Sequence, residues 1–123
     1  MFMQNTLCIR GAVIVKENSI KEIKNSTVKL LKEIFAQNSL DKEKIINIIF
    51  TVTDDLDSLN PATVTRKELK IDFVPMLCIQ EMKVRDGLPR CIRVMIQVCS
   101  NLNKDQIKHV YLGEAANLRP DLA

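Results

Sequence analysis

The segment 91–98 constrains the fold most, because its side chains alternate strictly between two classes. One face of the expected strand is β-branched and aliphatic, and the other is mixed and carries an arginine: Ile92, Val94, Ile96 and Val98 against Cys91, Arg93, Met95 and Gln97. Such a strand packs its apolar face on a core and leaves the other face for different contacts. The chain therefore requires a sheet with one apolar face.

Two segments predict helices that could cover that face. Apolar residues at three- and four-residue spacing, capped by Asn18 or Ser19, predict a helix that ends near Gln37. Asn60 and Pro61 supply a cap and a first-turn proline for a short helix over 62–69. The apolar stripe of the long helix consists of Ile20, Ile23, Thr27, Leu30, Leu31, Ile34 and Phe35.

The remaining strands are expected over 6–15, 45–53 and 74–81, where β-branched and apolar residues cluster. Asn103 and Gln106 predict a capped short helix that runs into Val110, and 111–118 fits strand or coil equally. The order β-α-β-α-β-β predicts an α+β fold, a mixed β-sheet with helices packed on one face. With 123 residues, the chain is expected to form a single domain over 1–123.

Composition limits the partners and the compartment. The 18 basic and 15 acidic residues give a net charge of only +3, spread along the chain, and aromatic residues make up 4%. Neither a basic tail nor a base-stacking platform is present, so we expect no nucleic-acid partner. No apolar run approaches the roughly 20 residues of a membrane helix, and no signal peptide opens the sequence. We therefore expect no membrane partner and a cytoplasmic protein.

The cysteines and the single histidine give no metal motif. Cys8, Cys78, Cys91 and Cys99 include no pair with the two-residue gap of a zinc or redox site. We expect unpaired thiols, the first three of them buried in strands as small hydrophobic residues. His109, the only histidine, is expected at the surface or at a helix end rather than as a general base.

Arginines on expected strands are the unusual feature of this sequence. A guanidinium such as that of Arg93, in mid-strand, must be paired or must face a ligand. A structural ion pair with Glu81 on a neighbouring strand is one interpretation. Convergence with Arg10 and Arg66 on a ligand with two carboxylates is the other, because each guanidinium binds a carboxylate with two hydrogen bonds. Tyr111 fits either a packing or a binding role.

Five short motifs occur in order along the chain and together carry a family resemblance. The chain closely resembles the small monofunctional chorismate mutases of the trimeric α/β class known from Bacillus. The resemblance spans nearly the whole chain, including the amphipathic helix and the acidic 54–56 loop. The motifs are Ile9-Arg10-Gly11-Ala12, Cys78-Ile79-Gln80-Glu81-Met82, Cys91-Ile92-Arg93-Val94-Met95, His109-Val110-Tyr111-Leu112 and Leu118-Arg119-Pro120-Asp121-Leu122.

This resemblance implies the rearrangement of chorismate to prephenate, a unimolecular pericyclic step in aromatic amino-acid biosynthesis. One C–O bond breaks as a C–C bond forms, with no proton transfer, so no cofactor or metal is implied. Catalysis would come from selecting the reactive conformer and stabilising charge on the ether oxygen. The resemblance also implies a pseudo-α/β-barrel homotrimer with each site between two subunits.

The resemblance further implies roles for individual residues. Arg93 would donate to the ether oxygen, Arg10 and Tyr111 would bind a carboxylate, and Glu81 would accept from the ring hydroxyl with help from Cys78. The other implied substrate-binding residues are Leu77, Ile79 and Gln80 on one wall, with Ala62, Thr63, Arg66 and Leu118 around the entrance.

Two other functions fit the same residues. One is a non-catalytic or regulatory trimer that binds a small dicarboxylate through the arginines. It stays open because Asn60 and Thr63 stand where the resembling family often has an aromatic residue and a lysine. The other is a small-molecule hydrolase or deaminase with Glu81 as general base, for which no partner group is apparent.

Overall fold

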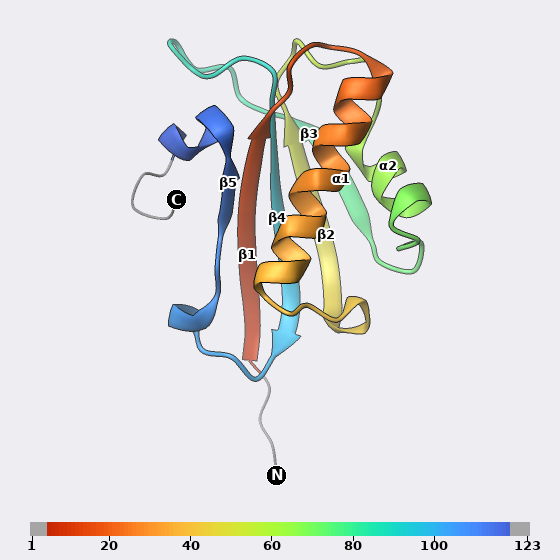
Figure 1. The fold of residues 1–123 in the computed structure, drawn as a ribbon, viewed down its shortest axis with the longest axis vertical. Helices are drawn as coiled ribbons and strands as arrows, with labels where there is room; N and C mark the ends of the chain where they lie inside the picture. The colour runs from red at the N-terminus through yellow and green to blue at the C-terminus, as the bar shows by residue number, and fades with distance from the viewer. Residues whose placement is uncertain (1–4, 119–123) are drawn as a thin grey trace.

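A computed structural model describes residues 5–118, in which one mixed sheet carries both α-helices on the same face (Figure 1). No helix in this range is long and apolar enough to cross a membrane. The elements in chain order are β1 (Asn5–Ile14), α1 (Ile20–Gln37), the 3₁₀ helix η1 (Lys42–Lys44), β2 (Ile45–Val52), α2 (Pro61–Glu68), β3 (Met76–Gln80), β4 (Cys91–Ser100), the 3₁₀ helix η2 (Lys104–Gln106), β5 (Val110–Leu112) and the 3₁₀ helix η3 (Gly113–Leu118).

The strand with the strictest alternation lies in the middle of the sheet. The five strands have the order β3-β2-β4-β1-β5, so β4 is flanked on both sides. It runs antiparallel to β1 and to β2, whereas β1 with β5 and β2 with β3 are parallel pairs. The α+β class and the mixed sheet with helices on one face are therefore confirmed.

The helix-covered face of the sheet forms the core. Ser19 begins α1 by accepting a hydrogen bond from the Glu22 backbone N–H at 3.1 Å, as the cap prediction requires. Gly11 lets the helix approach β1, because a Cβ there would lie 2.8 Å from Ile34 Cδ1 and 2.9 Å from the Val110 carbonyl oxygen. The fully buried core side chains include Ile9, Ile23, Leu30, Leu31, Ile34, Ile48, Phe50, Ile92 and Ile96.

The predicted apolar stripe of α1 is right except at its first residue. Ile23, Leu30 and Ile34 are buried, but Ile20 is 62% exposed. The helix begins beyond the tip of β1 (Figure 1), so its first turn has no sheet beneath it. Helical periodicity fixes the direction of a side chain, but not whether a partner lies in that direction.

The prediction of a helix from Asn103 into Val110 is wrong. Only the three-residue η2 forms, and the chain is already extended at Ile107. Asn38, at the end of α1, explains the difference: its side chain accepts from the Lys108 N–H and donates to the Lys108 carbonyl, both at 2.8 Å. These bonds remove the Lys108 backbone from helical pairing, and Val110 then begins β5. The ambiguous segment 111–118 is part strand and part 3₁₀ helix.

The other face of the sheet, which we call the open face, is covered by residues 5–118 only at one end. There Ala12, Cys91 and Ala115 form a small buried cluster beneath η3, with Tyr111 and Leu118 packed against it. Elsewhere the open face exposes large apolar side chains: Leu77 is 61% exposed, Ile79 48% and Met95 40%.

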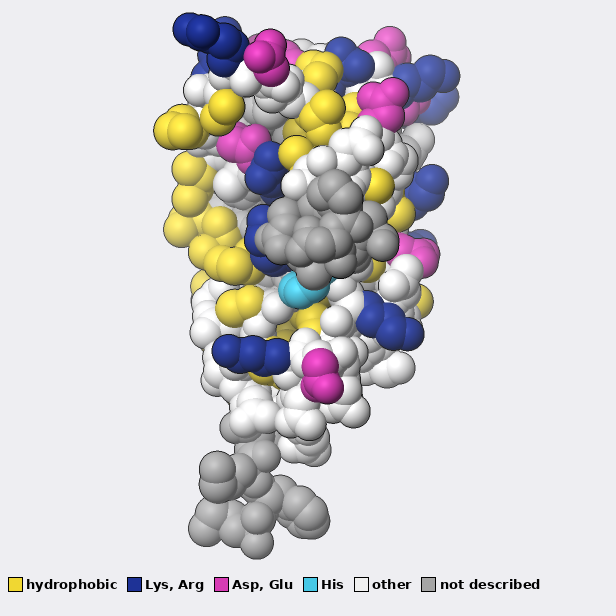
Figure 2. All heavy atoms as spheres, turned by 90° about the vertical axis from the view of Figure 1, so that its left-hand side faces the viewer, with side chains coloured by type: hydrophobic (Ala, Val, Ile, Leu, Met, Phe, Trp, Pro, Cys, Tyr) yellow, Lys and Arg dark blue, Asp and Glu magenta, His cyan; other side chains and the backbone are white. Residues whose placement is uncertain are grey.

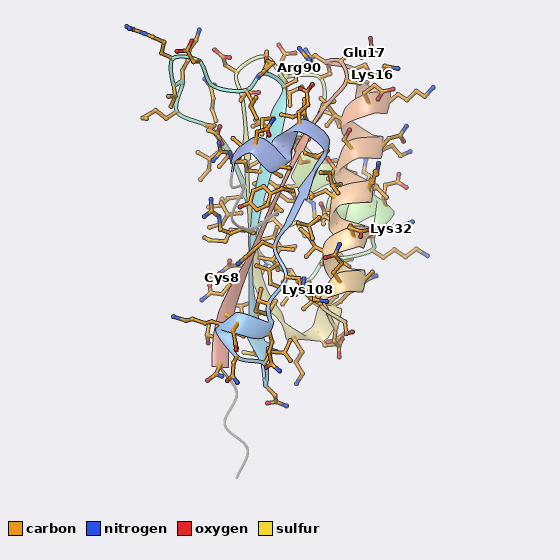
Figure 3. All side chains as sticks on the ribbon, turned by 60° about the vertical axis from the view of Figure 1, so that its left-hand side comes forward. Cys8, Lys16, Glu17, Lys32, Arg90 and Lys108 are labelled. Carbon is orange, nitrogen blue, oxygen red and sulfur yellow. The ribbon has the colours of Figure 1, made fainter. Side chains whose placement is uncertain are left out.

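The cysteines are unpaired, but their burial is not uniform. Cys91 is buried and Cys78 and Cys99 are half-buried, whereas Cys8, expected inside, is exposed. Figure 3 shows Cys8 on β1 and Lys32 on α1 at opposite sides of the molecule, so Cys8 lies on the open side of the sheet. The alternation of β1 was predicted correctly, but no element within residues 5–118 covers that part of the open face.

Candidate active site

One row of residues crosses all five strands on the open face. Backbone register aligns Thr51 of β2 with Arg93 of β4, and Arg93 with Ala12 of β1. The row continues to Ile79 on β3 and to Tyr111 on β5. Side chains that are register partners project from the same face of a sheet. The topology thus brings Arg93 and Tyr111, which are far apart in the sequence, onto one surface.

Arg10 joins this surface through the alternation of β1. It lies two residues before Ala12 and is half-buried, with its face shared by Cys8 and Ala12. Its backbone N–H donates to His109 Nδ1 at 2.9 Å. His109, which is half-buried between η2 and β5, therefore accepts a hydrogen bond through its ring. The expected position at the surface or at a helix end is compatible with this contact.

The expected ion pair between Arg93 and Glu81 is present, but the expectation that Glu81 lies on a strand next to that of Arg93 is wrong. Arg93 Nε lies 3.1 Å from Glu81 Oε1, with side chains 38% and 22% exposed. Glu81 follows β3, and its N–H donates to the Val52 carbonyl at 2.8 Å. The strand β2 separates it from β4. The two long side chains meet above Thr51, whose hydroxyl donates to the same Oε1 at 2.8 Å.

Two buried polar groups of this surface lack hydrogen bonds from the described residues. Arg93 Nε is close to Glu81 Oε1, but its N–H is not directed at that oxygen, so the contact is electrostatic and not a hydrogen bond. The Tyr111 hydroxyl is likewise buried without a partner within 5–118. Buried polar groups are normally satisfied. Two unsatisfied donors on one surface indicate a place where a polar ligand binds.

A cleft of about 500 Å³ opens beside this surface. Glu81 and Arg93 line it together with Leu118 of η3. The rest of the wall was not predicted from the sequence; the loop 82–89 and Thr53, Asp54 and Asp55 provide it. The only signal was the polar, turn-forming composition of these loops.

The acidic loop has a structural task at the start of β4. Asp55 accepts from the Thr53 hydroxyl at 2.5 Å and from the Arg90 N–H at 2.9 Å, while Thr53 Oγ1 accepts from the Cys91 N–H at 2.9 Å. Burial raises the pKa of Asp55, but the bonds from Thr53 and Arg90 outweigh it, so the net pKa is lowered. The sequence predicted only a surface loop here. The bond from the Cys91 N–H joins this loop to β4 two residues before Arg93.

A second group of expected site residues lies elsewhere in the protomer. Ala62, Thr63 and Arg66 belong to α2, on the helix-covered side, where Ala62 is buried in the core and Arg66 is exposed. The strand alternation also divides the expected wall: Leu77 and Ile79 face the open side, whereas Cys78 packs against the core. Gln80 shares the side of Cys78. The protomer therefore does not bring all of these residues together.

The thiols near the site are neutral at pH 7. Burial raises the pKa of Cys78. Burial is also the largest influence on Cys91, whose net pKa is raised although the neighbouring Arg93 lowers it. A neutral thiol is a poor nucleophile. Within residues 5–118, no three His, Cys, Asp or Glu side chains are grouped to hold a metal ion.

Comparison with known proteins shows the family of this chain. The model of the family "chorismate mutase type I" matches residues 6–122. This range includes the motif 118–122, of which residues 119–122 lie outside the described range. The chain is 40% identical over 115 residues to chorismate mutase AroH of Bacillus subtilis (strain 168), covering 94% of this chain and 91% of that protein. It is also 40% identical over 115 residues to chorismate mutase AroH of Thermus thermophilus, covering 93% of each.

A solved structure extends the similarity to three dimensions. The chorismate mutase from Clostridium thermocellum is 43% identical, matches with a TM-score of 0.87, and covers 90% of this chain and 98% of that one. The family model and the relatives each span nearly the whole chain. This chain belongs to the chorismate mutase type I family.

Proposed function

We propose that this protein rearranges chorismate to prephenate in aromatic amino-acid biosynthesis. The reaction is intramolecular, with one C–O bond breaking while one C–C bond forms. It needs a surface that holds one conformer and stabilises developing negative charge, without a nucleophile or a general base. The neutral thiols and the paired Glu81 carboxylate are compatible with such a reaction.

The unsatisfied N–H of Arg93 is the observation that carries this proposal. The Nε atom of Arg93 is buried, belongs to a residue of the central strand β4 and has no hydrogen-bond acceptor among the described residues. A donor held ready in this way costs little reorganisation when charge builds on the ether oxygen in the transition state. Glu81 lies close enough to keep the guanidinium in place. Arg93 is therefore assigned to the ether oxygen.

The neighbouring side chains fit the two ends of the substrate. The unsatisfied Tyr111 hydroxyl and the guanidinium of Arg10 would bind a carboxylate. Glu81 would accept a hydrogen bond from the ring hydroxyl, because a carboxylate is an acceptor only. These assignments give the ether oxygen, the ring hydroxyl and one of the two carboxylates of chorismate a partner of opposite character.

We propose that the site is completed by a second copy of the chain in a homotrimer. Arg10, Glu81, Arg93 and Tyr111 lie on the open face, whereas Ala62, Thr63, Arg66 and Cys78 lie on the helix side, so a ligand that touches both groups must sit between two protomers. The apolar open face supports contact between copies. In Figure 2, hydrophobic side chains follow the left-hand outline, which is the side away from the helices.

A continuous assay of chorismate absorbance tests the activity, and light scattering on the same sample tests the trimer. Decay of chorismate with formation of prephenate by a species of three times the protomer mass is the expected result. A trimer that binds a dicarboxylate without consuming chorismate would instead support the non-catalytic alternative. An active monomer would overturn the shared site.

A further inference from the structure

Thr51 occupies the position between the two charged groups of the site. It lies on β2, with Arg93 opposite on β4 and Ile79 opposite on β3, two residues before Glu81. Its side chain therefore projects from the open face beneath the place where the Arg93 and Glu81 side chains meet. No role follows for Thr51 from the motifs that carry the family resemblance.

The hydroxyl of Thr51 makes the directional contact to the Glu81 carboxylate. Thr51 Oγ1 is 2.8 Å from Oε1, and a carboxylate only accepts, so the threonine donates. Arg93 Nε lies 3.1 Å from the same Oε1 but does not direct its N–H toward it. No hydrogen bond or ion pair from the described residues reaches Oε2 of Glu81. One oxygen is thus fixed and the other is available.

The position of Thr51 makes this contact rigid. A β-branched residue has few side-chain rotamers, and Thr51 is part of a strand paired on both sides. Glu81, by contrast, follows the end of β3 and carries a longer side chain with more rotatable bonds. Without the Thr51 hydroxyl, the carboxylate is free to turn and to form two parallel hydrogen bonds with the Arg93 guanidinium.

We propose that Thr51 is a positioning residue for the Glu81–Arg93 pair. Its hydroxyl fixes Oε1, which keeps Oε2 for a hydroxyl of the ligand and prevents the carboxylate from satisfying the donor that Arg93 needs for catalysis. The proposal rests on the function proposed above, since it concerns the same site. It adds a residue from a strand that supplies no other group to the reaction.

Kinetics of matched substitutions at position 51 test this role. Thr51→Val keeps the shape and removes the hydroxyl, and should lower kcat/KM about 10- to 100-fold, as expected for a lost hydrogen bond to a charged group. The loss should appear in kcat as well as in KM, because the Arg93 donor is affected too. Thr51→Ser keeps the hydroxyl and should stay within about threefold of the parent protein.

A control elsewhere separates positioning from packing. Thr27 is buried on α1 and donates to the Ile23 carbonyl at 2.8 Å, so Thr27→Val makes the same chemical change away from the site. It should leave kcat/KM unchanged even if the melting temperature falls. Should Thr51→Val fail to fold, the pair Thr51→Ser and Thr51→Ala gives the same comparison, since these two variants differ only in the hydroxyl.

The outcomes distinguish this proposal from the function on which it rests. If the parent protein does not consume chorismate, the proposed function fails. Suppose instead that the parent protein is active and that the Thr51→Val variant, shown to be a folded trimer, has the kcat and KM of the parent. The positioning role of Thr51 is then overturned and the function stands. Equal losses in Thr51→Val and Thr51→Ser would also overturn it, because they would assign the effect to packing.

Discussion

The two faces of the central sheet differ in how completely the protomer satisfies them. On the helix side, Ile9, Phe50 and Ile96 are fully buried, and α1 and α2 complete their packing. On the open side, Leu77 is 61% exposed, and the buried Arg93 Nε has no hydrogen-bond acceptor among the described residues. The same strands build both faces, since alternate residues point in opposite directions.

This difference separates stability from function within single strands. The helix-covered face excludes water from apolar side chains, which is the main source of folding free energy. The open face keeps polar groups that the fold does not satisfy, at a cost in stability, and such groups are available to a ligand or to another copy. Substitutions on the two faces should therefore change different measurements.

The largest effect is expected from Phe50→Ala on the helix-covered face. Phe50 is fully buried on β2, so truncation should lower the free energy of unfolding by about 3–5 kcal/mol. Chemical denaturation at fixed protomer concentration measures this, with Ile20→Ala, at a 62% exposed position, as a control expected to cost under about 0.5 kcal/mol. A loss below about 1 kcal/mol for Phe50→Ala would contradict the assignment of the core to this face.

The next effect is on turnover and concerns Arg93 on the open face. Arg93→Ala should lower kcat by about 10²–10³-fold, the scale of losing one oxyanion donor. Arg93→Lys keeps the charge but not the planar donor geometry, and should also be badly impaired. The measurement is turnover of variants that scattering shows to be folded trimers. Near-normal turnover together with lost stability would make Arg93 a structural ion-pair partner and weaken the proposed mechanism.

The smallest effect is a pH-dependent one at the edge between the two faces, where Asp55 accepts from Thr53 and Arg90. Because the folded state lowers the pKa of Asp55, its carboxylate stabilises the fold above the ordinary pKa of about 4, and this contribution is lost as pH falls through the lower, folded-state pKa. Asp55→Asn should cost under about 1 kcal/mol at pH 7, since the group is exposed.

Melting curves measured at neutral pH and below about pH 3 check the Asp55 prediction. The difference between the parent protein and Asp55→Asn should be present at neutral pH and shrink in acid. Asp72→Asn, at an exposed residue before β3, is the matched control. A difference that grows in acid would contradict the lowered pKa.

Local patterns predicted the elements of this fold well. The Ser19 cap, the Asn60-Pro61 start of α2 and the alternation of β4 all depend on neighbours within a few residues, and the structure confirms them. The predictions failed where a distant residue decides. Asn38 bonds to Lys108, 70 residues further along the chain, and so prevents the helix expected after Asn103. Among the described residues, no element covers Cys8 although its strand is apolar.

The site was predicted as a set of residues but not as an arrangement. Arg93 and Glu81 were paired correctly, yet the place of β2 between β3 and β4, and with it the contact of Thr51, was not foreseen. A threonine in an apolar strand has a side chain typical of any sheet, so the sequence offered no signal. The bonds that Asp55 and Thr53 make to the start of β4 were hidden for the same reason.

The sequence by itself determined most of the extended and helical segments, the one after Asn103 excepted, and which strand face is apolar, because these depend on side-chain periods of 2.0 and 3.6 residues. The shared motifs also identified the family. Only the tertiary structure decided the strand order, which aligns Thr51, Arg93 and Tyr111 in one row, and which polar groups remain unsatisfied. Strand order depends on contacts between segments far apart in the chain, and no local pattern encodes which segments will meet.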